Sequence, residues 1–186
     1  MQVKNVKVGP LKTNCYVLID GENAIVIDPG DEFYKIKPLI ENHRLIAVLL
    51  THRHEDHIKA LPDIVRYYGC PVYDRNNLEE RRYDFCGTKL EVIYTPGHTS
   101  DSVSYYFYEY GFMFVGDFIF KGTIGRCDLP TGNFEEMKKS ILKMKNYSER
   151  TILYPGHEAF ASLGEEIRLN PYLKGLKWLL FFVYYS

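Results

Sequence analysis

The sequence has 186 residues, of which 46% are hydrophobic and 25% are charged, and its formal net charge at pH 7 is −1. This length and apolar content predict a single domain over residues 1–186, and they exclude a disordered or fibrous chain. The near-neutral charge provides no basic surface for nucleic acid, so we expect no nucleic-acid partner.

The predicted elements of the N-terminal half are strands followed by helices. Alternating or continuous apolar residues predict strands, and apolar residues at helical spacing predict helices. The strands are expected at Val3–Val8, Cys15–Ile19, Ala24–Asp28 and Ile46–Leu50, and the helices at Phe33–Asn42 and Ile58–Tyr68. The continuous apolar run at 46–50 is typical of a strand that is covered on both faces.

The C-terminal half repeats this scheme. Strands are expected at Lys89–Tyr94, Val103–Tyr108, Phe112–Val115 and Thr151–Tyr154, and a helix at Phe134–Asn146. Strands that are covered on both faces and interspersed with helices predict an α/β fold in which two sheets lie between two helix layers.

The cysteines and the first residues of the chain indicate the cellular compartment in which the protein is expected. The four cysteines, Cys15, Cys70, Cys86 and Cys127, are far apart and form no Cys-x-x-Cys pair. The first residues alternate like a strand and lack the apolar core of a signal peptide. We therefore expect reduced thiols and a cytoplasmic protein.

An apolar tail is expected at about 172–186. Its strongly apolar run, Leu176 to Tyr184, is about half the length needed to span a bilayer, so we expect no transmembrane segment. We expect this run to pack on the body of the protein or in a homo-oligomer contact. Association with a membrane surface is the less favoured alternative, because the run has no basic face.

Five of the six histidines follow closely after predicted strands, and only His43 lies apart, in a polar helix end. Two aspartates occupy the same kind of position. Imidazoles and carboxylates that converge at strand ends are costly to bury unless something pairs with them, and a divalent metal would do so. The residues of this set are His52, His54, Asp56, His57, His98, Asp117 and His157.

The residue types narrow the chemistry. Histidine and aspartate without cysteine suit zinc, iron or manganese. Seven ligands are too many for one tetrahedral ion and suit two ions that share a bridge. Two ions about 3.5–4 Å apart can activate a water and bind an oxygen of the reacting group, which predicts a hydrolase. A binding module with structural ions is the less favoured alternative, because thiolate ligands are missing.

The motifs that carry these residues resemble those of the metallo-beta-lactamase superfamily. They are Thr-His-x-His-x-Asp-His at 51–57, Pro-Gly-His-Thr at 96–99, Gly-Asp at 116–117 and Pro-Gly-His at 155–157, in this order. The resemblance implies an αββα four-layer sandwich with a dinuclear metal site at one edge.

The resemblance also implies a role for each residue. One ion would be held by His52, His54 and His98. The other would be held by Asp56, His57 and His157, with Asp117 as the bridge. Asp56 and Asp117 would serve catalysis as ligands, Asp117 also as a proton acceptor, and Asp28 would orient a ligand by hydrogen bonding. The cofactors expected are two divalent ions, zinc first, with iron or manganese as alternatives.

Within the superfamily, the segments at 13–16, 125–130 and 165–171 are similar to short glyoxalase II-like hydrolases. This similarity implies a hydroxyacylglutathione hydrolase-like enzyme that cleaves a small thioester or ester with a metal-activated water. Arg126 is the candidate for binding a substrate carboxylate, and a surface ion pair with Asp128 is the alternative. His57, where many secreted β-lactamases carry Arg, argues against antibiotic hydrolysis.

Other activities on the same scaffold stay open. They are a persulfide dioxygenase with one iron, a lactonase, and another ester hydrolase such as a phosphodiesterase. The chain departs from the family pattern at Lys59-Ala60, Asp101 and Cys127. It also has no room for the C-terminal helical domain that helps full-length glyoxalase II bind glutathione, so specificity for glutathione is not predicted.

Overall fold

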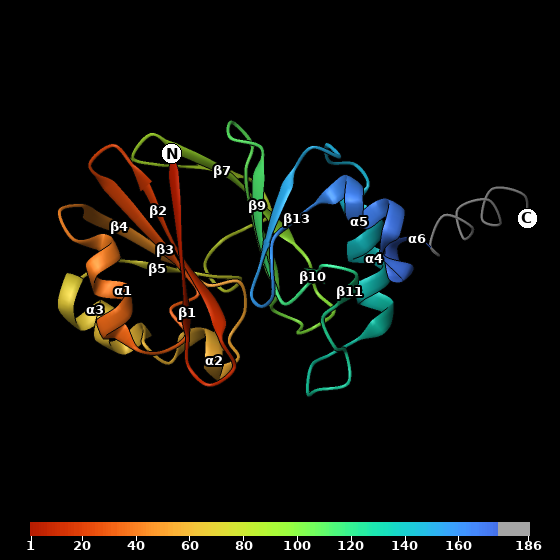
Figure 1. Ribbon diagram of the computed structural model, residues 1–186, viewed down its shortest axis with the longest axis horizontal. Coiled ribbons are helices and arrows are strands. Elements are labelled where there is room, and N and C mark those ends of the chain that lie inside the picture. Colours follow the sequence, from red (N-terminus) through yellow and green to blue (C-terminus); the bar gives the residue numbers. More distant parts are fainter. Residues whose placement is uncertain (175–186) are drawn as a thin grey trace, which may run out of the picture.

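Two β-sheets face each other in the computed structural model, which describes residues 1–174, and helices cover the outer face of each sheet (Figure 1). The first sheet has the order β1 (Gln2–Val8), β2 (Thr13–Asp20), β3 (Asn23–Ile27), β4 (Arg44–Leu49), β5 (Val72–Tyr73). The second has the order β13 (Ala161–Ser162), β12 (Ile152–Pro155), β9 (Phe112–Gly116), β8 (Val103–Phe107), β7 (Thr88–Tyr94), β6 (Arg82–Phe85). The predicted αββα sandwich is confirmed.

The helices and one small hairpin complete the described fold. The hairpin pairs β10 (Ile119–Phe120) with β11 (Thr123–Ile124). The helices are α1 (Phe33–Ile40), α2 (Glu55–Ile58), α3 (Leu61–Tyr68), α4 (Phe134–Met144), α5 (Leu163–Leu169) and α6 (Pro171–Lys174). In Figure 1, α1 and α3 lie outside the first sheet, and α4 and α5 lie outside the second.

The alternation of side chains along each strand builds three apolar layers. In β2, Val17 points to the layer under α1 and α3, whereas Leu18 points to the layer between the sheets. In β9, Phe114 enters the layer between the sheets, and Met113 enters the layer under α4 and α5. Because successive side chains point to opposite faces, one strand can serve two layers.

The strand directions bring several chain segments to one edge of the sandwich. β4 is parallel to β3, and β12 is parallel to β9. β7 and β9 are both antiparallel to β8, so they run the same way. The carboxyl ends of parallel strands meet at one edge, where ligands bind in many α/β proteins. β2 is antiparallel to β3, so its first residues reach the edge at which β3 ends.

Two expectations from the sequence need comment. The helix expected at Ile58–Tyr68 is wrong as one element, because α2 ends at Ile58 and α3 begins at Leu61, where Pro62 occupies the first turn. Proline is tolerated there but would break a continuous helix. The apolar run at Leu176–Tyr184 lies outside the described residues. Within residues 1–174, no helix is both long enough and apolar enough to cross a membrane.

Candidate metal centre

The loop after β4 and the short helix α2 that follows it carry three of the histidines. Leu49 ends the strand, and α2 begins at Glu55, so residues 51–54 turn sharply across the edge of the sheet. Arg53 points away from the other side chains of this loop, and its guanidinium pairs with the buried carboxylate of Asp74. This ion pair anchors the loop, with His52 on one side of Arg53 and His54 on the other.

The structure brings all seven predicted residues together. Three sets have their ligand atoms within 4.8 Å of one another. One of them, Asp28, His52 and His57, overlaps the other two, which share no member. The three-histidine group consists of His52, His54 and His98. The mixed group consists of Asp56, His57 and His157. These sets are the two that the family resemblance implied.

Asp117 lies between the two groups. Its Oδ2 is 3.5 Å from Nε2 of His98 and 3.5 Å from Nε2 of His157. Its Oδ1 is 3.3 Å from Nε2 of His57. β9 ends at Gly116, so Asp117 is the first residue after this strand of the second sheet. It lies at the edge of the sandwich, opposite the loop that follows β4. One carboxylate therefore faces both groups.

Asp28 supports the cluster from the buried side. Its backbone is left-handed, with φ 50°, which turns the side chain beneath the loop after β4. Oδ1 accepts a hydrogen bond from the backbone N–H of Thr51 (2.8 Å), and Oδ2 accepts one from the Thr51 hydroxyl (2.6 Å). Oδ2 also lies 3.0 Å from Nδ1 of His57, which fixes the orientation of that ring.

Three polar atoms of the cluster are buried and make no hydrogen bond within residues 1–174: Nε2 of His52, Nε2 of His57 and Oδ1 of Asp117. Buried polar atoms are otherwise nearly always paired. A divalent cation would satisfy all three, and the donors are imidazole nitrogens and carboxylate oxygens without thiolates. The cluster therefore fits zinc, iron or manganese.

The pKa values of the cluster differ between its histidines. Burial lowers the pKa of His52 well below its usual value and so keeps the ring neutral. Burial would also lower the pKa of His57, but Asp28 and Asp117 outweigh it and raise this pKa to about 10. The pKa of Asp117 is lowered despite burial, because His57 and His52 stabilise its carboxylate. A metal ion would displace the proton of His57.

Two glycines allow the segments of the cluster to approach each other. A Cβ at Gly156 would lie 2.3 Å from Oδ1 of Asp117 and 2.5 Å from Cε1 of His57. A Cβ at Gly116, where φ is +54°, would lie 2.3 Å from Oγ1 of Thr51. Real Cβ contacts are longer than this, so both positions require glycine.

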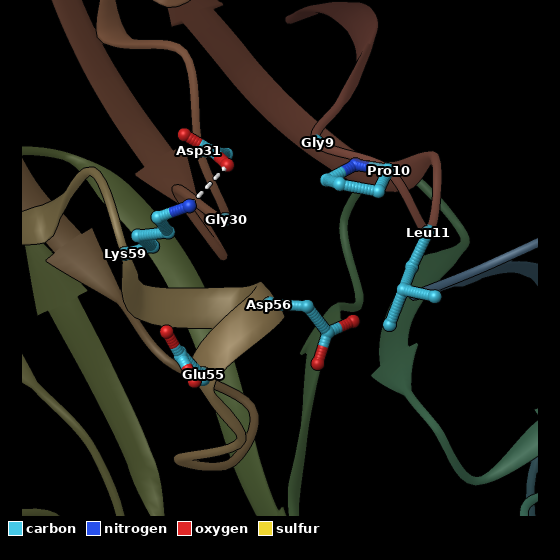
Figure 2. A pocket seen from close by; sticks show the side chains of 8 residues that line it. All are labelled: Gly9, Pro10, Leu11, Gly30, Asp31, Glu55, Asp56 and Lys59. Carbon is cyan, nitrogen blue, oxygen red and sulfur yellow. Dashed lines mark hydrogen bonds and ion pairs between the residues drawn. The ribbon is translucent and has the colours of Figure 1, made fainter.

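Two members of the mixed group are partly open to solvent. The side chains of Asp56 and His157 are 26% and 22% exposed, whereas those of His57 and His98 are 0% and 5% exposed. Asp56 also lines a hollow of about 260 Å³, and the other residues that line it are Gly9, Pro10, Leu11, Gly30, Asp31, Glu55 and Lys59. Figure 2 shows the Asp56 carboxylate and the Leu11 side chain at this hollow, with the ion pair of Lys59 and Asp31 at its rim.

A second hollow, of about 360 Å³, reaches the other group through His54. Its remaining lining residues are Arg53, Thr99, Asp101, Leu129, Pro130 and Thr131. The two hollows therefore approach the cluster from two directions, one at Asp56 and one at His54.

Arg126 makes two kinds of contact, one through its side chain and one through its backbone carbonyl. The sequence did not predict the backbone contact. Its guanidinium forms two hydrogen bonds of 2.7 Å with the Asp128 carboxylate at the surface, which is the ion pair considered as the alternative. Its backbone carbonyl accepts a hydrogen bond of 2.7 Å from Nδ1 of His98. Thr13 contacts Asp56 of the cluster, and Asn14 contacts the backbone of Pro155, close to His157. No metal-binding residue type marked either of them in the sequence.

Comparisons with known proteins agree with this geometry. The family model of the metallo-beta-lactamase superfamily matches residues 8–80 and 74–157. The probable metallo-hydrolase YqgX of Bacillus subtilis (strain 168) is 33% identical, over 94% of this chain and 99% of YqgX. Hydroxyacylglutathione hydrolase GloC of Haemophilus influenzae is 28% identical, over 93% of this chain and 98% of GloC. The crystal structure of TTHA1623 in a di-iron-bound form superposes with a TM-score of 0.84 at 31% identity, covering 91% of this chain and all of that one.

Proposed function

The chain belongs to the metallo-beta-lactamase superfamily, and on that premise we propose that it hydrolyses a small thioester at a centre of two divalent metal ions. The observation that carries the proposal is the meeting of five histidines and two aspartates at one edge of the sandwich, with three buried atoms left without hydrogen bonds in the described chain. The similarity to GloC supports the substrate class, because its name describes a thioester hydrolase.

We assign the three-histidine group to one ion and the mixed group to the other, with Asp117 as the shared ligand. Zinc is the ion that we propose first. The same donors suit iron and manganese, and the structurally similar TTHA1623 has been crystallised with two irons. When bound, the ions supply a water of lowered pKa and an electrophilic partner for the carbonyl oxygen of the substrate.

Hydrolysis of a thioester needs a group that takes up the proton of the attacking water, and we assign this role to Asp117. Asp117 would take up the proton that the attacking water releases, because its carboxylate lies between the two groups, with Oδ2 3.5 Å from Nε2 of both His98 and His157. Hydrolysis forms a carbon–oxygen bond and breaks the carbon–sulfur bond. The thiolate is a stable leaving group, so no separate acid is needed, and the proton on Asp117 returns to solvent.

The two hollows provide space for the two ends of such a substrate. Leu11 and Pro10 give the hollow at Asp56 an apolar wall. Arg126 lies beyond the other hollow, on the segment that also contains Leu129 and Pro130, and we propose that it contacts an anionic part of the substrate. Its planar guanidinium can exchange the Asp128 carboxylate for a substrate carboxylate.

The proposal is tested with protein that has been loaded with zinc, iron or manganese. We expect up to two ions per chain and hydrolysis of small thioesters that exceeds the activity on lactones, phosphodiesters and β-lactams. His54→Ala and Asp117→Ala should abolish hydrolysis while circular dichroism shows a folded chain. His43→Ala is the matched control, because His43 contacts the carbonyl of Glu41 away from the cluster. Full activity in either cluster variant, or oxygen uptake with a persulfide and one iron per chain, would refute the proposal.

A further inference from the structure

The first residue of β2 reaches the metal centre. Thr13 Oγ1 donates a hydrogen bond of 2.8 Å to Oδ2 of Asp56, and the Thr13 side chain is fully buried. The same Oδ2 lies 3.2 Å from Nε2 of His157, so Thr13 acts on the carboxylate oxygen that faces the mixed group. A buried hydroxyl at this distance fixes the side-chain rotamer of Asp56.

The next residue, Asn14, holds the segment that carries His157. The backbone N–H of Asn14 donates a hydrogen bond of 2.7 Å to the carbonyl of Gly156. Its side-chain amide donates to the carbonyls of Pro155 and Glu158, both at 3.0 Å. Asn14 is 2% exposed, so these bonds are shielded from water. Together they fix the backbone on both sides of His157.

The three-histidine group has other partners. Nδ1 of His98 donates to the carbonyl of Arg126 at 2.7 Å, and Nδ1 of His52 lies 3.1 Å from the Thr51 hydroxyl. His54 lies on the loop that is anchored through Arg53. Neither Thr13 nor Asn14 makes a hydrogen bond to this group in residues 1–174. Thr13 and Asn14 therefore support the mixed group alone. Asp28 and Thr51, in contrast, connect the two groups.

We infer that Thr13 and Asn14 are positioning residues for the second ion alone: they hold Asp56 and His157 at the spacing that this ion requires and leave the three-histidine group unaffected. The inference rests on the proposed two-ion function and deepens it. The start of β2 thus determines whether the centre works with one ion or with two. Loss of a hydrogen-bonding partner behind a ligand typically weakens metal binding by about 10–100-fold.

Thr13→Val tests the inference, because valine keeps the shape of threonine and lacks the hydroxyl. The matched control is Thr88→Val. Thr88 is 2% exposed, and its Oγ1 donates to Oδ2 of Asp20 at the same 2.8 Å, away from the cluster. Thr13→Ser restores the donor. Each protein is stripped of metal, checked for folding by circular dichroism, and titrated with zinc against a chromophoric chelator, which gives a dissociation constant for each ion.

The expected result is selective. Thr13→Val should raise the dissociation constant of one zinc ion at least about tenfold and leave that of the other within about twofold. Thr13→Ser and Thr88→Val should match the parent protein. Asn14→Ala should act in the same direction as Thr13→Val. A cobalt-substituted sample provides a second readout, because its visible spectrum should lose only the contribution of the second ion.

Three outcomes would overturn the inference. Equal weakening of both ions, no weakening in Thr13→Val, or the same weakening in Thr88→Val would each show that Thr13 does not position the mixed group selectively. A parent protein that binds only one ion would refute the two-ion function and the inference together. If two ions bind and Thr13→Val is selective, yet no thioester is cleaved, the substrate class fails and the inference stands.

Discussion

The carboxylate of Asp28 and the imidazole of His57 form a buried pair, with Oδ2 and Nδ1 3.0 Å apart and side chains that are 3% and 0% exposed. Since the carboxylate accepts a hydrogen bond from Nδ1–H, the other ring nitrogen is left to bind a metal. Nε2 of His57 is among the atoms without a hydrogen bond in the described chain. Asp28 thereby selects the tautomer of His57 that can bind an ion.

Asp28→Asn should weaken metal binding without unfolding the protein. Asparagine has nearly the same shape, but it removes the carboxylate that accepts a hydrogen bond from Nδ1 of His57 and makes Nε2 a stronger donor to a metal. We expect zinc affinity to fall by about 10–100-fold. Asp20→Asn is the control, since Asp20 also accepts a threonine hydrogen bond but lies away from the cluster. Equal zinc affinity in Asp28→Asn and the parent protein would contradict the prediction.

Removal of metal should lower the melting temperature and leave the fold intact. The three apolar layers lie away from the cluster and stay packed, whereas buried polar atoms such as Nε2 of His52 lose their partner. An ion at 100 times its dissociation constant stabilises a protein by about 2.7 kcal/mol. For a chain of this size, that corresponds to about 5–10 °C per ion. Calorimetry with and without a chelator measures the shift, and an unchanged melting temperature would contradict it.

The sequence predicts much of the centre because of where its residues fall. His52, His98, Asp117 and His157 each follow closely after a strand, and strands that run in the same direction bring such residues to one edge. Because these residues are histidines and aspartates, which are common metal ligands, they then predict a metal site at this edge. The sandwich follows from the same strands and from the helical spacing of the segments between them.

Apart from Asp28, which directly follows β3, the residues that support the cluster could not be predicted in this way. Thr13 begins a strand instead of following one, and only the antiparallel pairing of β2 with β3 places it beside Asp56. The contact of the Arg126 carbonyl with His98 involves a backbone group, which carries no signal of residue type. Short strands such as β5, β10 and β13 have two residues each, too few to show a period.

Gly156→Ala should disable the centre and spare the fold. The added Cβ would lie 2.3 Å from Oδ1 of Asp117 and 2.5 Å from Cε1 of His57, so the ligands must move apart. We expect loss of at least one bound ion and of hydrolysis. Gly164→Ala is the control, because its Cβ would crowd Glu149 at 2.8 Å, away from the cluster. Metal analysis that finds the parent ion content in Gly156→Ala would contradict the prediction.

Glu32 should keep the turn at Gly9 in place in mild acid. Lys35 and the Gly9 N–H lower the pKa of Glu32 to about 2. A carboxyl whose pKa is lowered on folding stabilises the fold above its unfolded pKa, and this contribution is lost as pH falls towards the folded value. The Gly9 amide shift in NMR spectra should therefore stay constant from pH 6 to about 3.5. A change of the Gly9 amide shift with its midpoint near the ordinary glutamate pKa would contradict the prediction. The Glu32→Gln variant provides the reference spectrum.

Arg126→Ala should raise KM for thioesters with a carboxylate and leave kcat nearly unchanged. The guanidinium pairs with Asp128 across an exposed surface, where the two side chains are 62% and 68% exposed, so its loss should cost little stability. If Arg126 exchanges Asp128 for a substrate carboxylate, neutral thioesters should be cleaved equally well by both proteins. Steady-state kinetics on a matched pair of anionic and neutral thioesters distinguishes these effects.

A second surface pair provides the control for this variant. Arg168 and Glu149 are also 2.7 Å apart, and each side chain is 61% exposed, but they lie on α5 and the loop before β12. Arg168→Ala should change neither KM nor kcat for either substrate. Asp128→Asn should lower KM for the anionic thioester, because it frees the guanidinium from its partner. If Arg126→Ala raises KM equally for both thioesters, Arg126 acts by holding the loop and does not contact the carboxylate.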